Sequence, residues 1–266
     1  MLEFYEPILN LSDSLHHNTM GVILSLKDPV NGSILQSVVE ELRVRFPYFY
    51  VKAAYRGNDL VTVPNSLPMT VRHTWDPVSF NTESSNYHLA AWKYKEYRLA
   101  FEISHSLTDG SGVLPYVQSA LYLYLSKVTG RSFDPARFRL PGQPIPESET
   151  GNPFKGLNID GAAAPLYQKK PISDFFRLAG GRGFGPLDPW IDELYIMTSL
   201  SKITDILCEI TCVGHHFFLA FMQPLSSPDY FRCFLEELTS AGMQYELLRS
   251  EPLRLCGITG EASGRP

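Results

Sequence analysis

The amino-acid sequence predicts an α/β fold in which a mixed β-sheet is flanked by helices. Short runs of alternating apolar residues are separated by turn residues, and longer segments carry apolar residues at helical spacing. Apolar residues make up 44% of the 266-residue chain and aromatic residues 12%, which is enough for a buried core and argues against disorder. A chain of this length forms either one large domain or two small ones.

The N-terminal part alternates strands and helices. A strand is predicted over residues 17–27, and Ser33 is predicted to cap the helix that follows. Pro47 ends this helix, and the strands 49–55 and 60–63 follow as a hairpin with an Arg-Gly-Asn-Asp turn. The apolar stripe of the helix consists of Ile34, Leu35, Val38, Val39 and Leu42.

A second hairpin, formed by strands 88–94 and 97–104, precedes a polar loop and a long helix over residues 111–128. We expect this helix to be largely buried, because most of its sides are apolar. Its apolar residues are Val113, Leu114, Val117, Ala120, Leu121, Leu123 and Leu125.

Proline and glycine then dominate residues 141–189, with eight of each in 49 residues. This share exceeds the level of about 25–30% at which low complexity is expected, so we interpret the stretch as a linker or crossover. Regular structure is predicted to resume in the strands 194–199, 203–212 and 217–222, the helix 229–241 and the strand 244–248.

These segments divide the chain into four parts. They are an N-terminal lobe (1–140), a Pro/Gly-rich linker or crossover (141–190), a partial C-terminal lobe (191–256) and a tail (257–266).

One segment is echoed later in the chain. Leu-Ala-Phe at 99–101 precedes a loop with Asp109 and a helix, and Leu-Ala-Phe at 219–221 precedes Asp229 and a helix at the same spacing. The second copy has Leu225 where the first has a histidine. Duplication of a strand–loop–helix unit explains the echo, and so does coincidence of a common pattern.

The segment Ser-His-Ser-Leu-Thr-Asp-Gly, residues 104–110, carries the most chemical information. His105 ends a strand before a buried helix, where a rigid support can aim a side chain. Histidine suits a general base that takes the proton of an acyl acceptor at neutral pH. Asp109 can fix the loop as a hydrogen-bond acceptor, and Gly110 permits close approach of a ligand. At average composition, the pattern H-x-x-x-D-G alone arises by chance in about one chain in forty of this length. The alternative interpretation of the segment is a turn with a surface histidine and a capping aspartate.

This segment resembles the H-H-x-x-x-D-G motif of the chloramphenicol acetyltransferase-like superfamily, which includes alcohol acetyltransferases and condensation domains. The resemblance extends to residues 42–55 and 186–251. It implies acyl transfer from an acyl thioester to the hydroxyl or amine group of a small-molecule acceptor. The thioester would be an acyl-CoA, such as acetyl-CoA, that acts as co-substrate. No bound cofactor would be required. His105 would be the base, Asp109 a structural support, and Gly110 the residue that admits the thioester arm. Ser104 takes the place of the first histidine, beside the bound substrate.

The resemblance also implies two similar lobes with a substrate tunnel between them. In this chain the second lobe lacks its early strands and helices, so the fold expected is of this type with an incomplete second lobe. A homo-oligomer could supply the missing wall of the tunnel. The alternative is a catalytically impaired remnant that binds a ligand or a protein partner.

Other classes of function are disfavoured. The net charge of −5 and the lack of a basic patch argue against nucleic-acid binding. No apolar stretch is long enough to span a membrane, and the N-terminus carries no signal sequence, so we expect a soluble cytoplasmic protein. The four cysteines are expected to be free, mostly buried thiols, and the group Cys208, Cys212, His215 and His216 does not match the ligand spacing of a zinc site.

Overall fold

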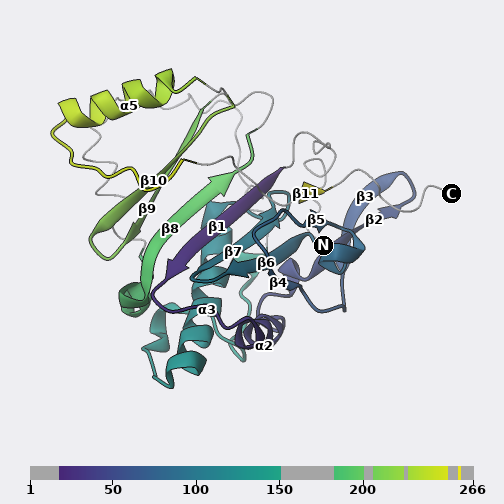
Figure 1. Ribbon diagram of the computed structural model, residues 1–266. Helices are drawn as coiled ribbons and strands as arrows, with labels where there is room; N and C mark the ends of the chain where they lie inside the picture. Colours follow the sequence, from purple (N-terminus) through teal and green to yellow (C-terminus); the bar gives the residue numbers. More distant parts are fainter. Residues whose placement is uncertain (1–17, 151–182, 201–205, 225–226, 251–256, 259–266) are drawn as a thin grey trace, which may run out of the picture.

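A computed structural model describes residues 18–150, 183–200, 206–224, 227–250 and 257–258. Its centre is a five-stranded mixed sheet (Figure 1). The strands, in their order across the sheet, are β4 (Val71–His73), β6 (Ala90–Lys95), β7 (Arg98–Ser104), β1 (Thr19–Leu26) and β8 (Ile191–Thr198). The predicted α/β fold with a mixed sheet flanked by helices is therefore confirmed.

Strand β1 holds the sheet together, because it pairs antiparallel with β7 on one edge and with β8 on the other. β6 and β7 form the second predicted hairpin, and β4 runs parallel to β6. β8 belongs to the stretch 191–256, so this part of the chain shares a sheet with the N-terminal part. The division into lobes, linker and tail stays a prediction.

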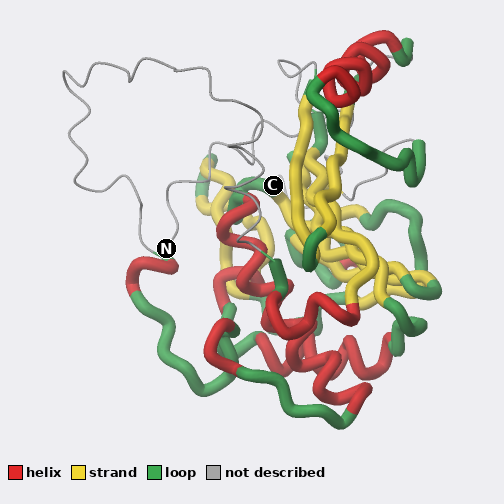
Figure 2. Tube along the Cα trace, turned by 90° about the vertical axis from the view of Figure 1, so that its left-hand side faces the viewer, coloured by secondary structure: helices red, strands yellow, loops and turns green. Residues whose placement is uncertain are grey.

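Two helices, α2 (Gly32–Leu42) and α3 (Gly110–Thr129), cover one face of this sheet, behind it in Figure 1 and to its left in Figure 2. The core lies between the helices and the strands. Tyr116 of α3 packs on Phe101 of β7 with ring centroids 4.7 Å apart, and Phe101 packs on Trp92 of β6 at 4.9 Å. As predicted from its apolar sides, α3 is largely buried.

The cap of α2 differs from the prediction. Asn31, not Ser33, is the N-cap residue, and its side-chain oxygen accepts the backbone N–H of Ile34 at 3.1 Å. The backbone N–H of Asn31 in turn donates to the Tyr124 hydroxyl of α3 at 2.8 Å, which fixes the start of α2 on its neighbour.

Smaller elements surround the main sheet. The first predicted hairpin is formed by β2 (Val51–Arg56) and β3 (Asp59–Pro64), and β5 (Ser79–Phe80) pairs parallel with β11 (Gly257–Ile258). Short 3₁₀ helices lie at Pro47–Phe49, Glu83–Ser85, Pro135–Arg137, Glu147–Glu149 and Gly185–Trp190. Residues 151–182, most of the Pro/Gly-rich stretch, lie outside the described residues.

A hairpin and a helix form a further layer. β9 (Leu207–Val213) and β10 (His216–Met222) pair antiparallel, and α5 (Asp229–Ser240) lies over them (Figure 1). The predicted strand 244–248 is wrong, because these residues follow α5 as an irregular segment without a strand partner. This segment is fixed at its end by an ion pair between Arg249 and Glu193 of β8.

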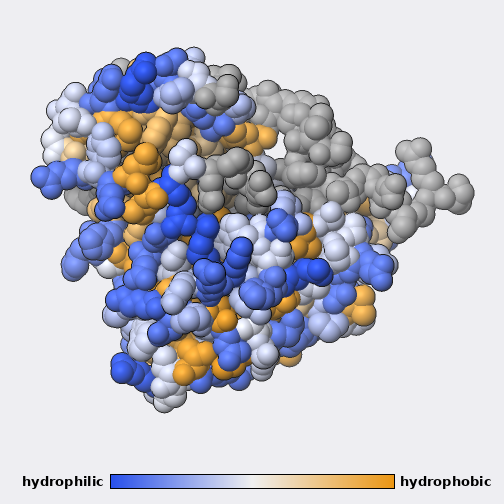
Figure 3. Space-filling model, in the orientation of Figure 1, coloured by the Kyte–Doolittle hydropathy of each residue, from blue (hydrophilic) through white to orange (hydrophobic). Residues whose placement is uncertain are grey.

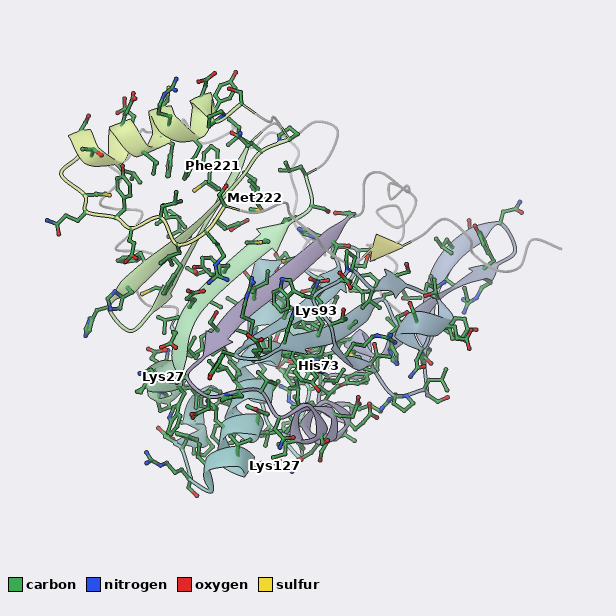
Figure 4. All side chains as sticks on the ribbon, in the orientation of Figure 1. Lys27, His73, Lys93, Lys127, Phe221 and Met222 are labelled. Atoms are coloured by element: carbon green, nitrogen blue, oxygen red, sulfur yellow. The ribbon has the colours of Figure 1, made fainter. Side chains whose placement is uncertain are left out.

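Among the described residues, no helix lies directly on the face of the main sheet opposite α2 and α3, and this face is polar along its middle. Lys93 of β6 lies on it (Figure 4) and forms an ion pair with Glu102 of β7, with 2.7 Å between Nζ and Oε1. Figure 3 shows hydrophilic residues over the middle of this side of the molecule and apolar residues gathered below α5.

Candidate active site

The loop singled out by the sequence leaves the main sheet at the end of β7. Ser104 is the last residue of the strand, and its carbonyl accepts the backbone N–H of Leu107 at 3.0 Å, which closes a turn around His105. The backbone N–H of His105 donates to the carbonyl of Asn18 at 2.8 Å, next to the start of β1. His105 is half-buried.

The acidic residue of the motif caps helix α3. Asp109 is the N-cap, and its Oδ1 accepts the backbone N–H of Gly112 at 2.8 Å. A cap of this kind satisfies one of the N–H groups that every helix start leaves unpaired. Asp109 therefore fixes the end of the loop that carries His105, and its part in a reaction stays a prediction.

The two glycines after Asp109 differ in their surroundings. A Cβ atom on Gly112 would lie 2.1 Å from the Thr108 hydroxyl oxygen, so a larger residue at this position would have to displace the Thr108 side chain. A Cβ atom on Gly110 would meet nothing within 4 Å, so the space beside this residue is open. The predicted role of Gly110 in admitting a substrate stays untested.

The serine in place of the first motif histidine points into the protein. Ser104 is 1% exposed, and its hydroxyl is 2.8 Å from the hydroxyl of Ser106, which is equally buried. The two hydroxyls stabilise the turn between them, because Ser106 also donates its backbone N–H to Ser104 Oγ at 3.4 Å. Direct contact of Ser104 with a substrate, as predicted, stays untested.

Glu209 of β9 is a half-buried charged residue that the sequence interpretation did not single out. Burial raises the pKa of the Glu209 carboxyl, and the charge of His105 lowers it in part. No motif includes Glu209, and the only signal in the sequence is its place in an otherwise apolar strand.

The described part of the chain contains no group of three or more histidine, cysteine or carboxylate side chains able to hold a metal ion. Cys208, Cys212 and Cys233 are free thiols, half-buried, buried and exposed in that order. Within the same residues, no helix is long and apolar enough to cross a membrane.

A small cavity lies at the other end of α3 from His105. Its volume is about 180 Å³, and Tyr124, Val128 and Trp190 contribute to its walls. Asp28 is the one carboxylate among its lining residues. Helix α3 thus separates this cavity from the loop that carries His105.

Comparison with known proteins gives a likeness at the level of fold. No family model and no curated protein matches the sequence. Among solved structures, polyketide synthase associated protein 5 from Mycobacterium tuberculosis matches 55% of this chain and 35% of its own, with 14% identity and a TM-score of 0.37. The SgcC5 protein from Streptomyces globisporus matches 67% of this chain and 41% of its own, with 14% identity and a TM-score of 0.33.

The first condensation domain of the calcium-dependent antibiotic synthetase matches 50% of this chain and 36% of its own, with 10% identity and a TM-score of 0.35. The chain therefore spans less than half the length of the structures that it matches. Over about half of its own length, it is similar in fold to condensation domains and to polyketide synthase associated protein 5.

Proposed function

We propose that the protein transfers an acyl group from an acyl thioester to a hydroxyl or amine acceptor, with His105 as general base. The observation that carries the proposal is the construction of the 104–110 loop. A half-buried histidine stands at the end of a central strand, and the aspartate of the motif is used to cap the next helix. A base held in this way loses little orientation when the substrate binds.

The reaction needs one proton carrier. A ring nitrogen of His105 takes the proton of the acceptor while the acceptor oxygen or nitrogen attacks the thioester carbonyl carbon. The new C–O or C–N bond forms, the C–S bond breaks, and the leaving thiolate takes the proton back from the imidazolium. The histidine ends as it began, and no covalent enzyme intermediate is required. Acyl-CoA is the donor that we propose, because the family that the motif resembles uses it.

Release of free CoA from a panel of acyl-CoA donors and alcohol or amine acceptors tests the proposal. His105→Ala should lower turnover by about 10²–10⁴-fold, which is the usual contribution of a positioned acid–base group. His215→Ala is the matched control, because this histidine is exposed in the turn between β9 and β10 and should have no effect. Equal turnover of the His105→Ala variant and the parent protein would remove His105 from the mechanism.

The second candidate function is a non-catalytic binding module. The observation in its favour is the exposure of apolar side chains after α5, where Tyr245 is 48% exposed, Leu247 58% and Leu248 45%. Exposed apolar residues that gather on one surface commonly mark a contact site. A folded protein that binds acyl-CoA by calorimetry, yet releases no CoA with any acceptor, would favour this alternative.

A further inference from the structure

Strand β1 begins between the ends of its two neighbours in the main sheet (Figure 1). On one side, Thr19 of β1 is paired with Ser104, the last residue of β7. On the other side, Met20 of β1 is paired with Thr198, the last residue of β8. The three strands therefore meet at the edge of the sheet from which the loop of His105 departs.

A side chain closes the pairing of β1 with β8 at this edge. The backbone N–H of Thr19 donates to the hydroxyl oxygen of Ser199 at 2.9 Å, and the backbone N–H of Ser199 donates to the Thr19 carbonyl at 2.8 Å. Ser199 lies just beyond the last residue of β8, so its hydroxyl takes the place of a strand carbonyl where the chain leaves the sheet. Because Thr19 is buried, loss of this hydroxyl would leave a buried N–H without its partner.

The same peptide group of β1 holds the loop of His105 on its other side. The backbone N–H of His105 donates to the carbonyl of Asn18 at 2.8 Å. The Asn18 carbonyl and the Thr19 N–H belong to one peptide unit, which is planar and directs these two groups to opposite sides. A continuous chain of hydrogen bonds therefore runs from the His105 N–H, through this peptide unit, to the hydroxyl oxygen of Ser199.

We infer that Ser199 is a positioning residue for His105, which it holds in place through the peptide group between Asn18 and Thr19. The inference rests on the proposed function, in which His105 is the general base. Without the Ser199 hydroxyl, this peptide group is released on one side and can rotate, which carries the Asn18 carbonyl away from the His105 N–H. The imidazole moves with its backbone, whereas a general base must stay within about 0.5 Å of its productive position.

A second serine hydroxyl provides a matched control, because it joins the same two strands at the other end of β1. The hydroxyl of Ser25 donates to the carboxylate of Glu193 on β8 at 3.0 Å. Ser25 and Ser199 are both half-buried. In Ser25→Ala, Glu193 keeps its ion pair with Arg249. Comparison of Ser25→Ala with Ser199→Ala thus separates a general loosening of the two strands from a local effect at His105.

The test combines hydrogen exchange with an assay. Exchange of the His105 backbone N–H is followed by NMR in the parent protein, Ser199→Ala, Ser199→Thr and Ser25→Ala. Ser199→Ala should lower the protection of this N–H by about tenfold or more, because local opening then breaks fewer hydrogen bonds. Ser199→Thr, which keeps the hydroxyl, and Ser25→Ala should stay within about threefold of the parent protein.

The kinetic effect should follow the same order. A misplacement of about 1 Å can cost about 10²-fold in rate, so we expect a partial loosening of His105 in Ser199→Ala to lower kcat for CoA release by about tenfold. KM should change little, because the substituted hydroxyl acts through the backbone of the base. Ser199→Thr should restore most of kcat, and Ser25→Ala should keep it.

The outcomes separate the two claims. Unchanged protection of the His105 N–H in a folded Ser199→Ala variant would overturn the role of Ser199, whatever the activity. An equal loss of protection in Ser25→Ala and Ser199→Ala would also overturn it, because the effect would then be general. Full turnover in His105→Ala would overturn the proposed function, whatever the exchange. If Ser199→Ala does not fold, Ser199→Cys supplies a weaker acceptor of similar size, and protection equal to that of the parent protein would count against the inference.

Discussion

An ion pair attaches the Pro/Gly-rich stretch to the N-terminal part of the protein and offers a quantitative test of the structure. Arg45, just after α2, donates to both carboxylate oxygens of Glu149, at 2.9 and 2.7 Å. The Tyr48 hydroxyl donates to the same carboxylate at 3.2 Å. The side chains of Arg45 and Glu149 are only 3% and 9% exposed, so solvent screens this pair far less than a surface pair.

Replacing Glu149 with glutamine removes the negative charge and leaves the Arg45 guanidinium buried. Breaking a buried pair on one side costs about 3–5 kcal/mol, and the residual exposure of Glu149 places our expectation at the lower end, about 3 kcal/mol. With a urea dependence of about 2–3 kcal/mol per molar, the unfolding midpoint should fall by about 1 M or more. Glu147→Gln is the matched control, because this exposed residue lies in the same 3₁₀ helix; its effect should stay within about 0.5 kcal/mol.

The loss of stability caused by Glu149→Gln should also depend on pH. The hydrogen bonds from Arg45 hold the pKa of the Glu149 carboxyl below its ordinary value. A carboxyl with a lowered pKa in the folded state stabilises the fold fully above its unfolded pKa of about 4.3, and this contribution is lost as pH falls through the folded value. Urea unfolding followed by tryptophan fluorescence at pH 7 and near pH 3 measures both regimes. Equal midpoints for the two variants at pH 7, or a difference that persists undiminished near pH 3, would refute the reasoning.

Three further predictions concern the candidate site and the assembly. Asp109→Ala should cost about 1 kcal/mol in thermal unfolding through loss of the α3 cap, whereas Asp109→Asn should keep most of the stability because asparagine accepts the same hydrogen bond; a stable but inactive Asp109→Asn would point to direct catalysis. Gly112→Ala should displace Thr108 and lower CoA release. Gly110→Ala should leave the free energy of thermal unfolding within about 1 kcal/mol of that of the parent protein. Equal effects of the two substitutions in these measurements would contradict the contact at Gly112. Light scattering beside the CoA-release assay should find substantial activity only in an oligomer; a strictly monomeric protein with robust turnover would contradict the missing tunnel wall.

The sequence predicted those elements whose local pattern and tertiary surroundings agree. The hairpin of β6 and β7 and the helix α3 carry strong periodicity and were found within one or two residues of their predicted bounds. The cap of α2 was misassigned because Asn31 and Ser33 are both good N-cap residues, and the choice is made by the Tyr124 hydroxyl, about 90 residues away. Residues 244–248 alternate like a strand, but the sequence does not reveal that no neighbouring strand pairs with them.

The residues of the candidate site likewise divide into those that the sequence predicts and those that it does not. The positions of His105 and Asp109 follow from a contiguous motif, so the sequence was sufficient to find them. Glu209 depends on how the β9–β10 hairpin is seated on β8, through Thr211 and Leu194. Contacts of this kind join distant parts of the chain and leave no periodicity in the sequence. A single carboxylate in a largely apolar strand is a weak signal, and only the three-dimensional arrangement shows that it is half-buried.

The internal echo of the sequence has a structural counterpart that is consistent with a site in the first copy alone, as we propose. Both Leu-Ala-Phe segments lie in strands, β7 and β10, and both strands lead into helices, α3 and α5. The first helix rests on a five-stranded sheet and is largely buried, whereas the second covers a two-stranded hairpin and buries only Leu238. A loop tied at both ends to a buried strand and a buried helix can hold a histidine to within a fraction of an ångström, which a general base needs. A loop before an exposed helix on a small hairpin provides no such support.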